Sequence, residues 1–97
     1  MALTVRWTFE AEFQLDEILN YLENNWTDKE TRSFFSKLEK GIRTISEHPY
    51  QQKQSLRKEG TREYQIIPKI TLFYEFDEFE VIVLLLWSNR ANPDFLK

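Results

Sequence analysis

The 97-residue chain contains no cysteine, only two glycines and only three prolines. The lack of cysteine excludes a disulfide framework and a cysteine metal site, and it fits a reducing compartment. The scarcity of glycine and proline argues against a disordered chain. With a single histidine, His48, the sequence also lacks the usual metal-binding cluster, so we expect no metal and no other cofactor.

Targeting and membrane signals are absent as well. The first residues do not combine a basic segment with a following apolar one, so no signal peptide is expected. The apolar run Val81–Trp87 is far too short to cross a bilayer as a helix. We therefore expect a cytoplasmic protein with no membrane partner.

The chain does contain a high share of aromatic residues, 15%. Their large side chains allow a short chain to build a core. At this length we expect a single domain, residues 1–97, with no room for a second core. The net charge of −3 argues against broad non-specific affinity for nucleic acid, although a basic stretch lies within residues 53–69.

The pattern of residues 8–26 predicts a first helix from about Phe9 to Asn25. Thr8 offers an N-cap hydroxyl, and Glu10 and Glu12 lie in the first turn, where the helix dipole favours anions. The expected apolar stripe of this helix consists of Phe9, Phe13, Ile18, Tyr21, Leu22 and Trp26.

A second helix is expected to begin at the capping box formed by Thr27 and Glu30, and to end at His48-Pro49. Its expected apolar stripe consists of Phe34, Phe35, Leu38, Ile42 and Ile45. Gly41 costs about 1 kcal/mol relative to alanine within a helix, which predicts that another group packs closely there. Because the link between the helices is short, they should form an antiparallel hairpin.

Strand patterns occur at both ends of the chain. Leu3–Trp7 alternates with a period of two and predicts a short strand. Three further strands, Arg62–Ile67, Ile70–Phe76 and Val81–Trp87, are separated by short links and predict an antiparallel meander. Residues 50–60 are polar and remain unassigned. The fold class is α+β.

The last strand is unusual because both of its predicted faces are apolar. Strict alternation places Val81, Val83, Leu85 and Trp87 on one face and Ile82, Leu84 and Leu86 on the other. Either this is a central strand of a strongly curled sheet that the chain's own loops cover, or a partner covers its second face. The partner interpretation predicts that Ile82, Leu84 and Leu86, or their opposite-face neighbours, are more exposed than in a core strand.

Most catalytic templates are absent, and what remains is a set of basic residues on or near the meander. They are Lys53, Arg57, Lys58, Arg62 and Arg90. Phosphodiester cleavage needs positive groups near the developing charge, and Tyr64 and Tyr74 could stack on bases or donate a proton. The same cations also fit ordinary surface residues and charges that protect sheet edges.

At this point the order of elements becomes recognisable, and from about Val5 to Pro93 the chain resembles the RelE/ParE superfamily of type II toxin–antitoxin toxins. Three segments carry the resemblance. The first runs from Trp7-Thr8 through Ala11, Leu15, Ile18 and Tyr21-Leu22 to Trp26. The second contains Arg62, Tyr64 and residues 72–77, and the third is the apolar strand followed by residues 87–93.

The resemblance implies a β-α-α-β-β-β fold, with the helical hairpin packed on one face of a small, mainly antiparallel sheet. It implies a growth-inhibiting toxin of an addiction or plasmid-stabilisation module, neutralised by a cognate antitoxin through which the complex binds operator DNA. A wrapping antitoxin segment would cover the apolar strand at Ile82, Leu84, Leu86 and Trp87. The cellular target would be DNA gyrase for a ParE-like toxin, or the ribosome and its mRNA for a RelE-like toxin.

Three alternatives follow, and the ParE-like one is favoured. In the RelE-like alternative, an mRNA endonuclease would use Arg62, Arg90 and Tyr74 for catalysis and Lys53, Arg57 and Lys58 to bind RNA. Thr71, however, stands where the family often has an arginine, and no tyrosine follows Arg90. The third alternative is a non-toxic, decayed member that retains antitoxin binding.

Overall fold

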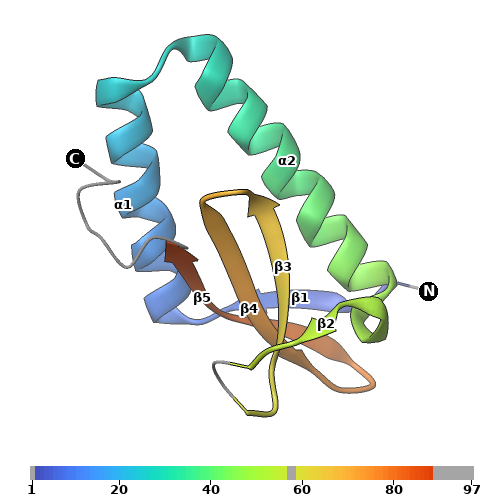
Figure 1. The fold of residues 1–97 in the computed structure, drawn as a ribbon. Coiled ribbons are helices and arrows are strands. Elements are labelled where there is room, and N and C mark those ends of the chain that lie inside the picture. The colour runs from blue at the N-terminus through green and yellow to red at the C-terminus, as the bar shows by residue number, and fades with distance from the viewer. Residues whose placement is uncertain (1, 57–58, 89–97) are drawn as a thin grey trace.

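The computed structural model describes residues 2–56 and 59–88 of the chain. Two helices follow a first strand, and four strands follow the helices (Figure 1). The elements are β1 (Thr4–Trp7), α1 (Phe9–Asn25), α2 (Asp28–Glu47), a 3₁₀ helix η1 (Pro49–Gln51), β2 (Lys53–Gln54), β3 (Arg62–Ile67), β4 (Ile70–Phe76) and β5 (Glu80–Ser88). This confirms the predicted α+β fold class.

The five strands form one mixed sheet in the order β1-β5-β4-β3-β2. Strand β4 pairs antiparallel with both β3 and β5, which confirms the predicted meander. Strand β1 lies at one edge and pairs parallel to β5, from Thr4 opposite Glu80 to Trp7 opposite Val83. The two-residue strand β2 lies in the polar segment 50–60, for which the sequence predicts no element, and pairs with β3 at the other edge.

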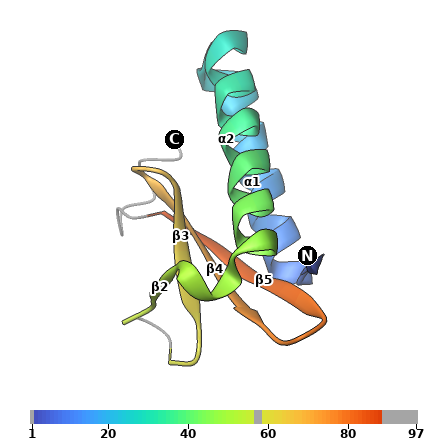
Figure 2. The ribbon, with the colours of Figure 1, turned by 90° about the vertical axis from the view of Figure 1, so that its right-hand side faces the viewer.

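The molecule has two layers, with both helices on the same face of the sheet (Figure 2). The core lies between these layers and combines residues of α1, α2, β4 and β5. Its largest fully buried side chains are Tyr74, Phe34, Leu22, Ile45, Ile70, Leu72, Val81 and Val83. Burial of this apolar area is the main stabilising contribution to the fold.

Both helices begin at the predicted caps. The Thr8 hydroxyl accepts a hydrogen bond from the Ala11 amide at 3.1 Å. At α2, the Thr27 hydroxyl accepts from the Glu30 amide at 3.1 Å, and the Glu30 carboxylate accepts from the Thr27 amide at 3.0 Å. These local bonds satisfy backbone donors that have no partner within the helix.

Gly41 brings α2 close to the sheet. A Cβ atom at this position would lie 2.7 Å from Cε1 of Tyr64 and 3.2 Å from Cδ1 of the same ring. The close packing predicted from a glycine inside the helix is therefore confirmed, and the neighbouring group is the aromatic ring of β3.

The predicted apolar stripe of α1 is partly wrong. Phe9 is 86% exposed and Phe13 is 55% exposed, whereas Ala11, Ile18 and Leu22 form the buried face. At about 100° per residue, the two phenylalanines lie nearly opposite the direction of Ala11. Spacings of four and five residues had placed them on one stripe with Ile18, but the core is on the other side of the helix.

The predicted faces of the last strand are also corrected. Phe73 pairs with Leu85 and Tyr74 pairs with Val83, so Leu84 is an extra residue, a β-bulge. The bulge shifts the alternation, and Leu86 points into the core, where only 4% of it is exposed. The prediction that Leu86 is exposed on one face with Ile82 is wrong for this reason.

Two side chains, from Gln14 of α1 and from its N-cap Thr8, bond the backbone of β5 around this bulge. The Thr8 hydroxyl donates to the Leu84 carbonyl at 2.9 Å, and the Leu86 amide donates to Oε1 of Gln14 at 2.8 Å. Strand β1 pairs with β5 only as far as Val83. Thr8 and Gln14 therefore satisfy backbone groups of β5 where β1 no longer does, and they fix α1 on the sheet.

Candidate functional site

Arg62, the first predicted catalytic residue, is held by contacts within the fold. Its Nη1 donates to the Gln52 carbonyl at 2.7 Å, and its guanidinium carbon lies 5.8 Å from the centre of the Phe76 ring. The side chain lines a pocket of about 340 Å³ that also includes Glu59 and Glu75. A guanidinium that already donates to a carbonyl and stacks on a ring has fewer donors left for a substrate phosphate.

Tyr74, the predicted proton donor, is a core residue. It is fully buried, and its hydroxyl donates to the Pro49 carbonyl at 2.5 Å. Burial raises the pKa of Tyr74 to about 12, and the nearby Arg62 charge opposes this shift only in part. Stacking on a base or transferring a proton to a substrate needs an accessible ring or hydroxyl, so the position of Tyr74 does not support the predicted catalytic role.

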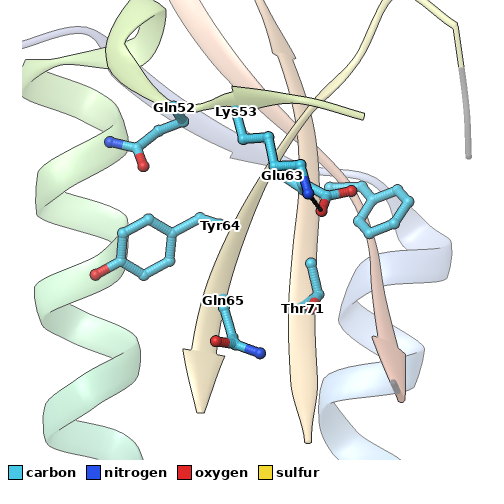
Figure 3. A pocket seen from close by; sticks show the side chains of 7 residues that line it. Gln52, Lys53, Glu63, Tyr64, Gln65 and Thr71 are labelled. Carbon is cyan, nitrogen blue, oxygen red and sulfur yellow. Dashed lines mark ion pairs between the residues drawn. The ribbon is translucent and has the colours of Figure 1, made fainter. Parts of the chain in front are cut away.

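Lys53 is the one predicted RNA-binding residue that lies in the described part of the chain. It projects from β2, its side chain is 70% exposed, and its Nζ lies 3.9 Å from Oε1 of Glu63 (Figure 3). The pair lies beside a polar pocket of about 570 Å³ on β2, β3 and β4. The lining side chains are Gln52, Lys53, Glu63, Tyr64, Gln65, Thr71 and Phe73.

The structure brings only part of the predicted nuclease set together. Arg62 lies opposite Tyr74 across β3 and β4, and both line one pocket, whereas Lys53 lines a different one. The Tyr74 side chain is nevertheless fully buried. Figure 3 shows Tyr64 directed toward α2 rather than toward the Lys53–Glu63 pair. Arg57, Lys58 and Arg90, the other predicted members of the set, lie outside the described residues.

The predicted antitoxin-binding strand has one buried and one partly exposed face. Ile82 and Leu85 are half-buried and Trp87 is 38% exposed, on the face opposite both helices. We call these three residues the outer sheet surface. Leu84, at the bulge, is half-buried, whereas Leu86 belongs to the core. The outer sheet surface is therefore the part of β5 that a partner can reach.

Neither a metal site nor a membrane segment is visible in residues 2–56 and 59–88. Their histidine, aspartate and glutamate side chains form no group of three that could hold a metal ion. None of the helices found there is long and apolar enough to cross a membrane.

One surface was missed by the sequence analysis, namely the outward face of α1 with Phe9 and Phe13. The signal was present, because Ala11, Leu15, Ile18 and Leu22 define a stripe with helical spacing that leaves both phenylalanines on the opposite side. Spacings of four and five residues group the two phenylalanines with Ile18, although they lie nearly opposite Ala11 around the helix.

Solved structures share this fold. A toxin chain of the chromosomal ParDE system from P. aeruginosa has a TM-score of 0.74 at 13% identity, over 90% of this chain and 96% of that one. A copper-bound mutant toxin from Helicobacter pylori has a TM-score of 0.62 at 25% identity, over 90% of this chain and 94% of that one. A chain of the E. coli DinJ-YafQ toxin-antitoxin complex has a TM-score of 0.61 at 9% identity, over 94% of this chain and 97% of that one.

A search of curated proteins finds no significant match. The family comparison is specific: residues 5–93 match the family described as ParE toxin of type II toxin-antitoxin system, parDE. This match spans nearly the whole chain, including all the helices and all but the first residue of the sheet. The chain therefore belongs to the ParE toxin family, within the RelE/ParE superfamily, and is the toxin component of a type II toxin–antitoxin system.

Proposed function

We propose that this toxin inhibits growth by binding a protein target, DNA gyrase, and that it does not cleave RNA. The observation that carries the proposal is the burial of Tyr74, whose hydroxyl is bonded to Pro49. The RelE-like alternative assigns catalysis to that tyrosine, and no tyrosine follows Arg90 in the sequence. Family membership supports gyrase, because the resemblance to ParE toxins implies that target.

Charge supports the same proposal. The net charge of −3 does not favour binding to the polyphosphate surface of a ribosome or an mRNA. In the described residues, Lys53 is paired with Glu63, and Arg62 contacts a carbonyl and a ring. A toxin with this surface is better suited to act by contact with another protein.

The cognate antitoxin is proposed to cover the outer sheet surface, Ile82, Leu85 and Trp87. The predicted set was Ile82, Leu84, Leu86 and Trp87. Leu86 is left out because it is in the core, and Leu84 because it is the extra residue of the bulge, which shifts the alternation so that Leu85 lies on the outer face. Partly exposed apolar side chains in one row offer area that a partner can remove from water. Binding of operator DNA by the complex is proposed to occur through the antitoxin, because the acidic toxin contributes little attraction for phosphate.

The test is a gyrase assay with the purified toxin. We expect increasing toxin to inhibit supercoiling of relaxed plasmid or to accumulate cleavage complexes, and the antitoxin to restore normal activity. A parallel reaction with translating ribosomes and mRNA should show no cleavage. Unchanged gyrase activity together with cleaved mRNA would overturn the proposal in favour of the RelE-like alternative. In that case, loss of mRNA cleavage by the Arg62→Ala variant would identify the nuclease site.

A third outcome would also contradict the proposal. If expression of the chain alone does not slow growth, and gyrase and mRNA are both unaffected, the chain is a non-toxic member that retains antitoxin binding.

A further inference from the structure

Phe9 and Phe13 form an exposed aromatic pair on a regular helix. They are 86% and 55% exposed and lie four residues apart, so they are neighbours on the surface of α1. Of the other large exposed hydrophobic side chains, Leu56 and Phe79 lie outside the helices and strands, and Tyr50 lies in the three-residue 3₁₀ helix η1. Single exposed hydrophobic residues are common, whereas two phenylalanines side by side offer an apolar area suited to a partner.

Four carboxylates bracket this pair. At about 100° per residue, Glu12 and Asp16 lie on one side of the two phenylalanines, and Glu10 and Glu17 lie on the other. All four are exposed, and neither of the ion pairs in the described residues involves α1. Helix α1 contains no lysine or arginine, in contrast to α2, which carries both charge signs.

The stability of α1 explains the four carboxylates around the phenylalanine pair only in part. Carboxylates in the first turn, Glu10 and Glu12, interact favourably with the helix dipole. Asp16 and Glu17 lie beyond that turn, and Asp16 follows Glu12 at a spacing where like charges repel each other. The two phenylalanines gain nothing from facing water. A partner with the opposite charge would reduce the repulsion between the carboxylates, and its apolar side chains would remove the two rings from water.

The charge identifies the chemistry of this partner. A surface with four carboxylates repels nucleic-acid phosphates and anionic lipid headgroups. Two copies of the toxin that met through this same surface would place like charges against each other. The complementary ligand is a polypeptide segment in which apolar side chains are flanked by lysine or arginine.

The position of the surface separates it from the antitoxin surface proposed above. Phe9 and Phe13 face away from the helix side that packs on the sheet. Both helices cover one face of the sheet (Figure 2), and the outer sheet surface is on the opposite face. The helices and the sheet thus lie between the two surfaces. One partner can occupy each surface.

We propose that the α1 surface, formed by Phe9, Phe13, Glu10, Glu12, Asp16 and Glu17, is where the toxin docks on its cellular protein target, through a basic and apolar segment of that target. The inference rests on the proposed function insofar as it requires a protein target. It goes further by assigning the docking surface and by separating it from the antitoxin surface.

The test compares variants of the two surfaces in the full chain. Phe9→Ser/Phe13→Ser is expected to lose growth inhibition and to weaken binding to purified gyrase about 30-fold, as for the loss of interface hot spots. Asp16→Lys/Glu17→Lys should weaken binding about tenfold, because it reverses the charge beside the rings. Both variants should bind the antitoxin with an affinity within about twofold of the wild type, since they leave the outer sheet surface intact.

Matched controls exist on other elements. Phe79→Ser removes a phenylalanine that is 75% exposed in the turn before β5, and Glu39→Lys/Glu47→Lys makes the same charge change on exposed positions of α2. Both should inhibit growth like the wild type. Ile82→Lys, on the outer sheet surface, should give the opposite result to the α1 variants. It should weaken antitoxin binding and leave growth inhibition unchanged.

Each result decides something. If Phe9→Ser/Phe13→Ser is folded and inhibits growth fully, the docking surface is not on α1. If the variant loses antitoxin affinity to the same extent, the surface belongs to the antitoxin and the proposal is overturned. A third result is that the wild-type toxin inhibits growth without affecting gyrase, and that Phe9→Ser/Phe13→Ser loses this growth inhibition. Gyrase is then the wrong target, and the docking surface on α1 is retained.

Discussion

Replacing Gly41 by leucine is expected to lower the free energy of unfolding by about 1 to 2 kcal/mol net, because overpacking costs more than the helix gains from losing glycine. A Cβ atom at this position would lie 2.7 Å from Cε1 of Tyr64, so the ring or the helix would have to move. Leucine favours the helix over glycine by about 0.8 kcal/mol. A net loss in urea denaturation would therefore report the crowding between α2 and β3 and not the helix itself.

Two further variants isolate the contact. In a Tyr64→Ala background, Gly41→Leu should cost nothing or should stabilise slightly, because the space of the ring is then free. Ser36→Leu, on an exposed position of α2, should change stability by less than about 0.5 kcal/mol. An equal loss from Gly41→Leu with and without the Tyr64 ring would contradict the close approach.

The second large effect is expected at Tyr74 under alkaline conditions. Its pKa is raised from the ordinary value of 10.0 to about 12 by burial. Above pH 10 the unfolded chain releases the proton of this tyrosine while the native chain retains it, so unfolding becomes easier as the pH rises. The stability contributed by the neutral, buried hydroxyl is present below pH 10 and is lost progressively between pH 10 and pH 12, by about 2 to 3 kcal/mol in total.

The measurement is urea denaturation of the wild type and of Tyr74→Phe between pH 7 and pH 12. At pH 7 the variant should be less stable by about 1 to 3 kcal/mol, because the Pro49 carbonyl loses its donor. The gap should close as the pH rises, since only the wild type has this ionisable group. A constant gap across the whole range would show that burial does not control the titration of Tyr74.

The same variant separates a structural tyrosine from a catalytic one. If Tyr74 only connects β4 to η1, Tyr74→Phe should inhibit growth as the wild type does at a temperature where both are folded. Loss of growth inhibition in a folded Tyr74→Phe protein would restore the nuclease alternative.

The helices could be predicted from the sequence because their ends depend on local chemistry. Thr8 and Thr27 cap the helices with bonds to residues three positions away, so the sequence alone locates the starts. The proline after His48 likewise ends α2 near the predicted position. Strand ranges were predictable for the meander because alternation and short turns are also local features.

Features of the sheet that depend on pairing between distant segments could not be predicted from the sequence. The bulge at Leu84 exists only because β4 and β5 pair with a shift, and it reverses the face of every residue that follows it. The two-residue strand β2 has no sequence pattern of its own and arises by pairing with β3. The parallel pairing of β1 with β5 joins the two ends of the described chain and has no local signal.

The candidate site shows the same division. Residue types suggested that Tyr74 acts on a substrate, but the surrounding core buries its ring and the Pro49 carbonyl accepts a hydrogen bond from its hydroxyl. The exposure of Phe9 and Phe13 depends on which side of α1 meets the sheet, and this is set by Ala11, Ile18 and Leu22 together. Family membership, in contrast, could be inferred from the order and spacing of motifs along nearly the whole chain.

We propose that this ParE-family toxin stops growth by binding a protein of DNA metabolism and not by cleaving mRNA. The most direct test is to induce the toxin alone and to follow incorporation of labelled thymidine and labelled amino acids over the first minutes. We predict that DNA synthesis falls first while protein synthesis continues. A fall in protein synthesis with cleaved mRNA, while DNA synthesis continues, would contradict the claim.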